Sequence, residues 1–301
     1  MPLHAYRVDA FTTTPGQGNA AGVVTDAAGL DPAQMQAIAA ELGCSETAFV
    51  LPASGPDHDL QLRFFTPTVE VPVCGHATIA AHFVLASASG HTGVIHQLSG
   101  AGVQRIETVR DDQGIAVRIR QNRPEFREPL APELVPEVMA ALGVGITDLD
   151  FRCPLQFVST GHGKLLLGIE RRDRLRELRP DFAQLAELSP LVGSNGYYVF
   201  TLDSADDDDA LCHGRMFAPA IGIEEDPVTG NANGPLGAYL VRHGLLLTVG
   251  GFTRFRARQQ AANGRGGFVD VSVRAEGDIP VEVEIEGRAV MGPQVALTSI
   301  R

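Results

Sequence analysis

The chain contains two similar segments far apart in the sequence, and this repeat limits the possible folds more than any other feature. "RFFTP" begins at Arg63, and "RMFAP" begins at Arg215. Seven positions after the proline of each segment stand Cys74 (67 to 74) and Asp226 (219 to 226). A glycine-containing turn and a run of small residues, typical of a tightly packed helix, follow in both places. The matched order of strand, turn and helix predicts an internal duplication, in which two halves share one topology.

The same comparison extends upstream and pairs residues of the two halves. "SETAFV", which contains Glu46, matches "SNGYYVF", which contains Asn195. On this alignment Glu46 corresponds to Asn195, and Cys74 corresponds to Asp226. The two halves are therefore expected to present different chemical groups at corresponding positions.

Two helices are expected to begin after these motifs, at Gly75 and Gly230. The first turn of a helix has unpaired backbone N–H groups and about half a positive charge. If the halves pair about a pseudo-twofold axis, both helix ends point into one cleft and can bind a carboxylate without a lysine. The chain has one lysine, Lys164, which we expect at a strand edge, because no matching phosphate-binding motif suggests a cofactor on it.

Composition excludes several classes of function. The net charge is −12, with 44% hydrophobic and 20% charged residues, as in ordinary globular proteins. This charge argues against nucleic acid or an anionic membrane as the main partner, although a pocket can still bind an anionic substrate. No apolar run reaches the roughly 18 residues of a membrane span, and the N-terminus does not resemble a signal peptide, so the cytoplasm is the expected location.

The length of 301 residues suits two domains. The proline-rich segment at 121–132 predicts their boundary, with domains at 1–125 and 126–301 and with the last strand a candidate for return to the first domain. The best-marked helix has Asp31 as its N-cap, Pro32 in its first turn and Gly43 at its end. The cysteines have no CxxC spacing and are expected to be free thiols, and no zinc-binding spacing is present.

Several motifs resemble the PhzF-like family of phenazine-biosynthesis isomerases, within the diaminopimelate-epimerase fold superfamily. The motifs are "SETAFV", "FTPTVEVPVCGHAT" and "EEDPVTGNANGPLGAYL", and the similarity runs from "VDAFTTTPGQGNAAGVV" to "QQAANGRGG". The resemblance implies an α+β fold of two similar domains in a pseudo-twofold arrangement, each a β-barrel-like sheet wrapped around a central helix. The family also suggests a homodimer, which nothing in the residues themselves indicates.

The resemblance implies cofactor-independent proton transfer on a small carboxylate-bearing metabolite, with no metal. In the family the glutamate of "SET" is the acid/base, which is Glu46 here, and His76 and Asp226 help to hold or relay protons. Glu46 follows a polar turn and enters an apolar strand, where a positioned carboxylate can take and return a proton. The positions expected to contact the substrate are Asn19, Cys74, Gly75, Gly230 and Asn231.

The chain also departs from the family pattern, and two alternatives stay open. Ala20 stands where the family has proline, and Asn231 stands where it has serine. One alternative is a non-catalytic protein of the same fold that binds a small carboxylate. The other is a thiol-dependent enzyme in which Cys74 acts with His76. A racemase with two facing cysteines is not expected, because Asp226 takes the place of the second thiol.

Overall fold

The computed structural model describes residues 4–204 and 209–297, which form two compact units. The first unit is the chain up to Arg120 together with the segment from Glu286 onward, and the second is Gln121–Ile285. The last strand, β17 (Ile279–Ala296), therefore has residues in both units. Whether each unit folds independently, as the predicted domains imply, stays a prediction. In the described part of the chain, no helix is long and apolar enough to cross a membrane.

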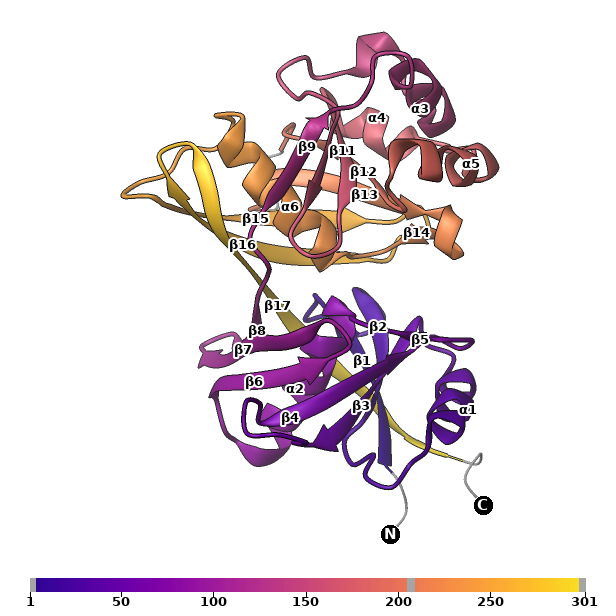
Figure 1. Ribbon diagram of the computed structural model, residues 1–301, viewed down its shortest axis with the longest axis vertical. Helices are drawn as coiled ribbons and strands as arrows, with labels where there is room; N and C mark the ends of the chain where they lie inside the picture. Colours follow the sequence, from indigo (N-terminus) through magenta and orange to yellow (C-terminus); the bar gives the residue numbers. More distant parts are fainter. Residues whose placement is uncertain (1–3, 205–208, 298–301) are drawn as a thin grey trace. The chain divides into compact units, whose positions relative to one another are not determined.

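The first unit is a closed barrel of eight strands (Figure 1). Its strands are β1 (His4–Ala10), β2 (Asn19–Val24), β3 (Glu46–Pro52), β4 (Leu60–Phe65), β6 (Gly93–Ser99), β7 (Gly102–Asp111), β8 (Gly114–Arg120) and β17. Strand β17 closes the ring, because it pairs with both β8 and β1. The pairs β2–β3 and β4–β6 are parallel. A short strand, β5 (Glu70–Val71), pairs with β4.

Helix α2 (Gly75–Ser89) is the central helix of this barrel. It contacts β1, β2, β3, β7 and β8. Apart from His76 and His82, its side chains are small or apolar on every face, and Ala77, Ile79, Ala80 and Ala81 are completely buried. A helix without a polar face has to be surrounded by protein. Helix α1 (Pro32–Leu42) contacts β3 and β4. It begins with the predicted Asp31 cap, which accepts a hydrogen bond from the Gln34 N–H.

The second unit repeats this topology. Its strands are β9 (Glu125–Pro129), β10 (Gln156–Ser159), β11 (Lys164–Ile169), β12 (Tyr197–Thr201), β13 (Cys212–Ala218), β14 (Ile223–Asp226), β15 (Phe252–Gln260) and β16 (Gly266–Glu276). The pairs β11–β12 and β13–β15 are parallel, as are β2–β3 and β4–β6 in the first unit. Helix α6 (Gly230–Arg242) contacts β10, β11 and β16, as the central helix of this unit. The predicted α+β fold and the predicted duplication are confirmed.

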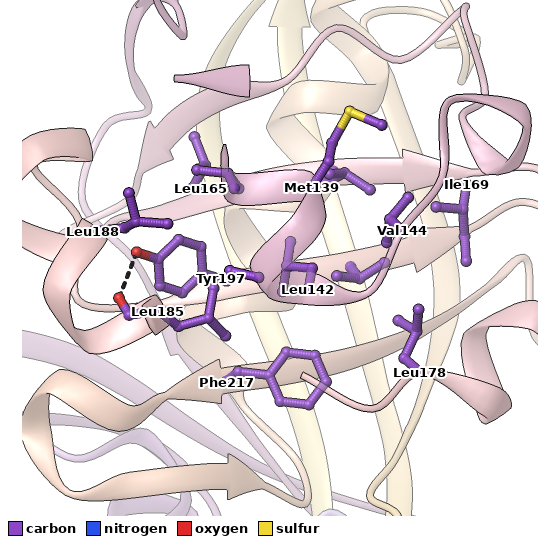
Figure 2. Packing of buried hydrophobic residues seen from close by; sticks show 14 of the residues in the cluster. Met139, Leu142, Val144, Leu165, Ile169, Leu178, Leu185, Leu188, Tyr197 and Phe217 are labelled. Atoms are coloured by element: carbon purple, nitrogen blue, oxygen red, sulfur yellow. Dashed lines mark hydrogen bonds between the residues drawn. The ribbon is translucent and has the colours of Figure 1, made fainter. Parts of the chain in front are cut away.

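Strands β11 and β12 are buried on both faces, and their alternate residues face different layers. On one face, Leu165, Leu167 and Tyr197 join a cluster with helices α3 (Val135–Leu142), α4 (Arg172–Glu177) and α5 (Phe182–Val192), shown in Figure 2. The Tyr197 hydroxyl donates to the Leu185 carbonyl at 2.8 Å. On the other face, Tyr198 and Phe200 contact residues of α6. Side chains alternate along a strand, so Lys164 and Leu166 also lie on the α6 side.

The strand register corrects the predicted correspondence of Glu46. The residue after Glu46 pairs with Phe65, and the residue after Gly196 pairs with Phe217. Phe65 and Phe217 occupy the same place in the repeated "RFFTP" and "RMFAP" segments. Glu46 therefore corresponds to Gly196, and the alignment with Asn195 is wrong by one residue.

The predicted correspondence of Cys74 with Asp226 is also wrong. Asp226 pairs in the sheet at the position that Val71 takes in the first unit. Three residues further on, Thr229 is the N-cap of α6, as Cys74 is the N-cap of α2. The spacing misled because a 3-10 helix of three residues, η2 (Pro219–Ile221), adds length between β13 and β14. Thr229, with a hydroxyl in place of a thiol, is thus the counterpart of Cys74.

Candidate functional site

Five of the predicted site residues come together at one end of the first barrel. Asn19 begins β2 and Glu46 begins β3, and these parallel strands are neighbours. His76 lies in the first turn of α2, and Cys74 is the N-cap of that helix. The fold gathers them because two parallel strands start where the enclosed helix also starts. The same turn begins with Gly75. The first hydrogen bond of the helix runs from the Thr78 N–H to the Cys74 carbonyl, so the Gly75 N–H takes no part in the helical hydrogen bonds.

The imidazole of His76 is the centre of this group. Its Nε2 atom lies 3.3 Å from Oε2 of Glu46 and 3.1 Å from Oγ of Ser45. Its Nδ1 atom lies 3.4 Å from Nδ2 of Asn19 and 3.4 Å from Sγ of Cys74. Ser45 precedes Glu46 in the "SET" motif, and its role was not predicted from the sequence.

These contacts assign the tautomer of His76. An amide nitrogen only donates, so Asn19 requires a lone pair on Nδ1, which places the ring proton on Nε2. The hydroxyl of Ser45 donates to the Ala20 carbonyl at 3.2 Å and is left to accept from Nε2–H. The Nε2–H group therefore donates to Ser45, and Oε2 of Glu46 lies 3.3 Å from the same nitrogen, so the carboxylate lies beside a hydrogen-bond donor.

The arrangement suits a carboxylate that accepts and returns a proton. The side chain of Glu46 is 13% exposed and that of His76 is 9% exposed. Glu46 is thus mostly shielded from water and held in one orientation, yet it still reaches the surface. A general base needs both a fixed position and access to the substrate.

The same residues also offer a set of metal ligands. Among the described residues, Glu46, Cys74 and His76 each contribute one ligand atom, and these atoms lie within 4.8 Å of one another. Sulfur, nitrogen and oxygen ligands of this kind suit Zn²⁺. The expectation that the protein works without a metal stays a prediction.

The other predicted site residues lie in the second unit, at the start of α6. The Thr229 hydroxyl donates to Oδ2 of Asp226. The side chain of Gln259, which is fully buried, holds both residues: Nε2 donates to the Asp226 carbonyl at 2.7 Å, and Oε1 accepts from the Thr229 N–H at 2.9 Å. Gln259 is a supporting residue that sequence reasoning did not identify.

Gly230 and Asn231 form the first turn of α6, where Asn231 takes the place of His76 in α2. The buried side chain of Gln121 donates from Nε2 to Oδ1 of Asn231 at 3.0 Å, and its Oε1 accepts from the Thr160 hydroxyl at 2.7 Å. An amide therefore occupies the position at which the first unit has an imidazole.

Lys164 is not the strand-edge lysine that the sequence suggested. It is the first residue of β11, but only 2% of the residue is exposed. Its Nζ atom contacts Nδ1 of His162 at 3.0 Å and donates to the Gly163 carbonyl at 3.3 Å. The one sequence feature that could have indicated its burial is that the only lysine of the chain stands between a glycine-rich turn and an apolar strand.

Comparisons with known proteins identify the family. The family profile described as phenazine biosynthesis-like protein matches residues 8–294. An uncharacterized isomerase of Clostridium acetobutylicum is 45% identical over 287 residues, which cover 95% of this chain and 95% of that protein. The uncharacterized isomerase YddE of Escherichia coli is 42% identical over 292 residues, which cover 97% of each chain.

A solved structure agrees with these sequence relatives. The PhzF-family phenazine biosynthesis protein of Bacillus anthracis superimposes with a TM-score of 0.88 and 27% identity, covering 99% of both chains. The profile match and the close relatives span nearly the whole chain, and those relatives are named isomerases. The protein is therefore an isomerase-type member of the phenazine biosynthesis-like family.

Proposed function

We propose that the protein is a cofactor-independent isomerase or epimerase that moves a proton on a small carboxylate-bearing metabolite, with Glu46 as the acid/base. The observation that carries this proposal is the 3.3 Å contact between Glu46 and the Nε2–H of His76. It supports a carboxylate held ready at the first turn of a helix. The residues at the start of α6 have their own supporting network, which favours a role in holding or relaying protons for Asp226.

In the proposed reaction, Glu46 takes a proton from the carbon next to the substrate carboxylate. Negative charge then develops on the substrate, and the N–H groups of Gly75 and His76 at the start of α2 can stabilise it. The protonated Glu46 returns the proton to another carbon, or, once the planar intermediate has turned over, to the other face of the same carbon. Asn19, Cys74, Gly230 and Asn231 are the proposed contacts of the substrate.

The first prediction tests Glu46 directly. The protein is incubated in deuterium oxide with a panel of amino and hydroxy acids, and the loss of each carbon-bound proton is followed by NMR. We expect Glu46→Gln to reduce exchange at least about 100-fold, because the amide cannot act as a base. Glu128→Gln, at an exposed glutamate of β9, is the matched control and should exchange at the wild-type rate. Unchanged exchange in Glu46→Gln would rule out the assignment.

One contact favours a second candidate function. The Sγ atom of Cys74 lies 3.4 Å from Nδ1 of His76, an arrangement that could activate a thiol. Under this alternative, iodoacetamide abolishes activity and Cys74→Ser reproduces the loss. Under the proposed function, Cys74→Ser retains most of the exchange. A third outcome, calorimetric binding of a small carboxylate without any exchange, would instead indicate a non-catalytic binding protein.

A further inference from the structure

Among the described residues, the buried ammonium of Lys164 has no salt-bridge partner. Its ammonium has three N–H donors, of which one meets Nδ1 of His162 and one meets the carbonyl of Gly163. Within the described ranges, the third donor has no acceptor and no carboxylate oxygen lies at ion-pair distance from Nζ. Buried charges in proteins are normally paired, so this ammonium has an unused capacity for an anion.

The surroundings of Lys164 lower the pKa of its ammonium but leave it mostly charged at neutral pH. Burial lowers the pKa of Lys164 to about 8, and the negative charge of Asp226 opposes this shift. The ammonium in turn lowers the pKa of His162 to about 4, with desolvation as a second cause. His162 is therefore neutral, and its exposed imidazole covers the ammonium as an uncharged acceptor.

The duplication shows what this lysine replaces. Gly196 is the counterpart of Glu46, and a Cβ atom added to Gly196 would lie 2.4 Å from Cδ and 2.8 Å from Cε of Lys164. In the second unit, the Lys164 side chain thus fills the space beside Gly196. The corresponding space in the first unit holds the side chain of Glu46. The two units carry side chains of opposite charge at equivalent places, a base in one and a cation in the other.

We propose that Lys164 is an anion site of the second unit that binds a small carboxylate, and that His162 is a positioning residue that covers the ammonium until the anion arrives. The incoming carboxylate replaces the neutral Nδ1 acceptor with a charged one, which makes a stronger hydrogen bond, and it also engages the third N–H. The inference goes beyond the proposed function, because it assigns a second anion-binding residue without using the reaction. The binding site itself does not depend on Glu46.

The test uses the fact that Lys164 is the only lysine of the chain. Protein labelled with ¹³C,¹⁵N-lysine gives a single side-chain amine signal, which is titrated with sodium acetate and with L-lactate, and with sodium chloride as the control for ionic strength. We expect both carboxylates to shift this signal saturably and to raise the pKa of Lys164, while chloride does neither. A signal that responds to carboxylates no more than to chloride would overturn the proposal.

Variants then measure how strongly the site binds acetate, by calorimetry. Lys164→Met removes the cation, and Gly196→Ala keeps the amine but displaces the methylene groups that carry it. We expect both to weaken acetate binding at least 10-fold. His91→Gln, at an exposed histidine after α2, should bind acetate as the wild type does. If Lys164→Met does not fold, Gly196→Ala and the NMR titration decide, and wild-type affinity in Gly196→Ala with its amine displaced would contradict the proposal.

One further variant separates this proposal from the proposed function. Glu46→Gln should lose proton exchange and still show the carboxylate-induced shift of the Lys164 signal. If Glu46→Gln loses exchange but carboxylates do not shift the Lys164 signal of the wild-type protein, only the anion site is rejected. A shift with undiminished exchange in Glu46→Gln rejects Glu46 as the base and leaves the anion site standing.

Discussion

At the scale of single residues, the contacts of His76 explain more than its position in a motif. The sequence predicted that Glu46 and His76 belong to one site, and the structure brings them to 3.3 Å. The tautomer of the ring could not be predicted, because it depends on Asn19, which lies 57 positions earlier in the chain. Only the fold brings that amide to Nδ1 and so directs the Nε2 proton toward Glu46.

This dependence leads to a prediction for Asn19→Asp. A carboxylate at this position accepts from Nδ1–H, so the ring proton leaves Nε2 and the lone pair there faces Glu46. We expect proton exchange to fall by roughly 100-fold or more, because the carboxylate then faces a lone pair in place of an N–H group and leaves its position. Exchange rates measure the effect, and ¹⁵N NMR of the ring nitrogens reports the change of tautomer.

The control for this substitution is Asn263→Asp, at an exposed asparagine whose side-chain oxygen accepts from the Arg265 N–H. Aspartate preserves that bond, so exchange should stay at the wild-type rate. If Asn19→Asp exchanged as fast as Asn263→Asp, the tautomer would not matter for the reaction.

At the scale of elements, the burial of α2 imposes a condition on His82. This residue is 1% exposed, and its Nε2–H donates to Oε1 of Gln97 at 2.8 Å. Its Nδ1 atom has no partner among the described residues, so a second ring proton would be buried without an acceptor. Desolvation accordingly lowers the pKa of His82 from 6.5 to about 4, although the Gln97 bond opposes the shift.

The lowered pKa predicts a loss of stability in acid. Between about pH 6.5 and pH 4, unfolded chains bind a proton at His82 that the folded protein excludes. This contribution is fully present above pH 6.5 and is lost as the pH falls to about 4, in total on the order of 3 kcal/mol. Urea denaturation at pH 7.5, 6, 5 and 4.5 measures it.

His82→Gln removes the titrating group, so its free energy of unfolding should change less with pH over this range than that of the wild type. His91→Gln, which removes an exposed imidazole, should keep the wild-type dependence. Identical pH profiles for wild type and His82→Gln would contradict the prediction, whatever the absolute stability of the variant.

Element boundaries were predictable where short-range signals define them. The cap at Asp31, the proline at Pro32 and the terminal Gly43 lie within one helix and its flanks, and α1 has these limits. The strand β14 and the helix η2 were not predicted, because segments of three or four residues carry no periodic pattern. Missing η2 displaced the alignment of the two halves by three residues and paired Cys74 with the wrong counterpart.

At the scale of the whole molecule, the duplication preserves an ion pair in two different environments. Arg63 binds Glu70 through Nε and Nη2, both at 2.7 Å, and Arg215 binds Glu225 through the same atoms at 2.6 and 3.0 Å. The side chains of the first pair are 24% and 41% exposed, and those of the second are 4% and 12% exposed. Arg215 also donates to the carbonyls of two residues, Leu175 and Leu178.

Equivalent substitutions should therefore have unequal costs. Arg215→Met removes a donor from the mostly buried Glu225 carboxylate and from two carbonyls, and we expect it to reduce the free energy of unfolding by about 3–5 kcal/mol. Arg63→Met should cost at most about 1 kcal/mol, because water replaces the lost donor. Urea denaturation of the two variants compares them, each serving as the control for the other. Equal costs would show that burial does not decide the contribution of this pair.

The sequence by itself determined the duplication, the helix starts at Gly75 and Gly230, and the grouping of Glu46 with His76, because repeats, caps and motifs are encoded by residues close together in the chain. The tertiary structure decided the closure of the barrel by β17, the counterpart of each site residue, the tautomer of His76 and the burial of Lys164. These depend on strand register and on contacts between residues far apart in the sequence. No local pattern specifies them, because a side chain's surroundings form only when distant strands pair.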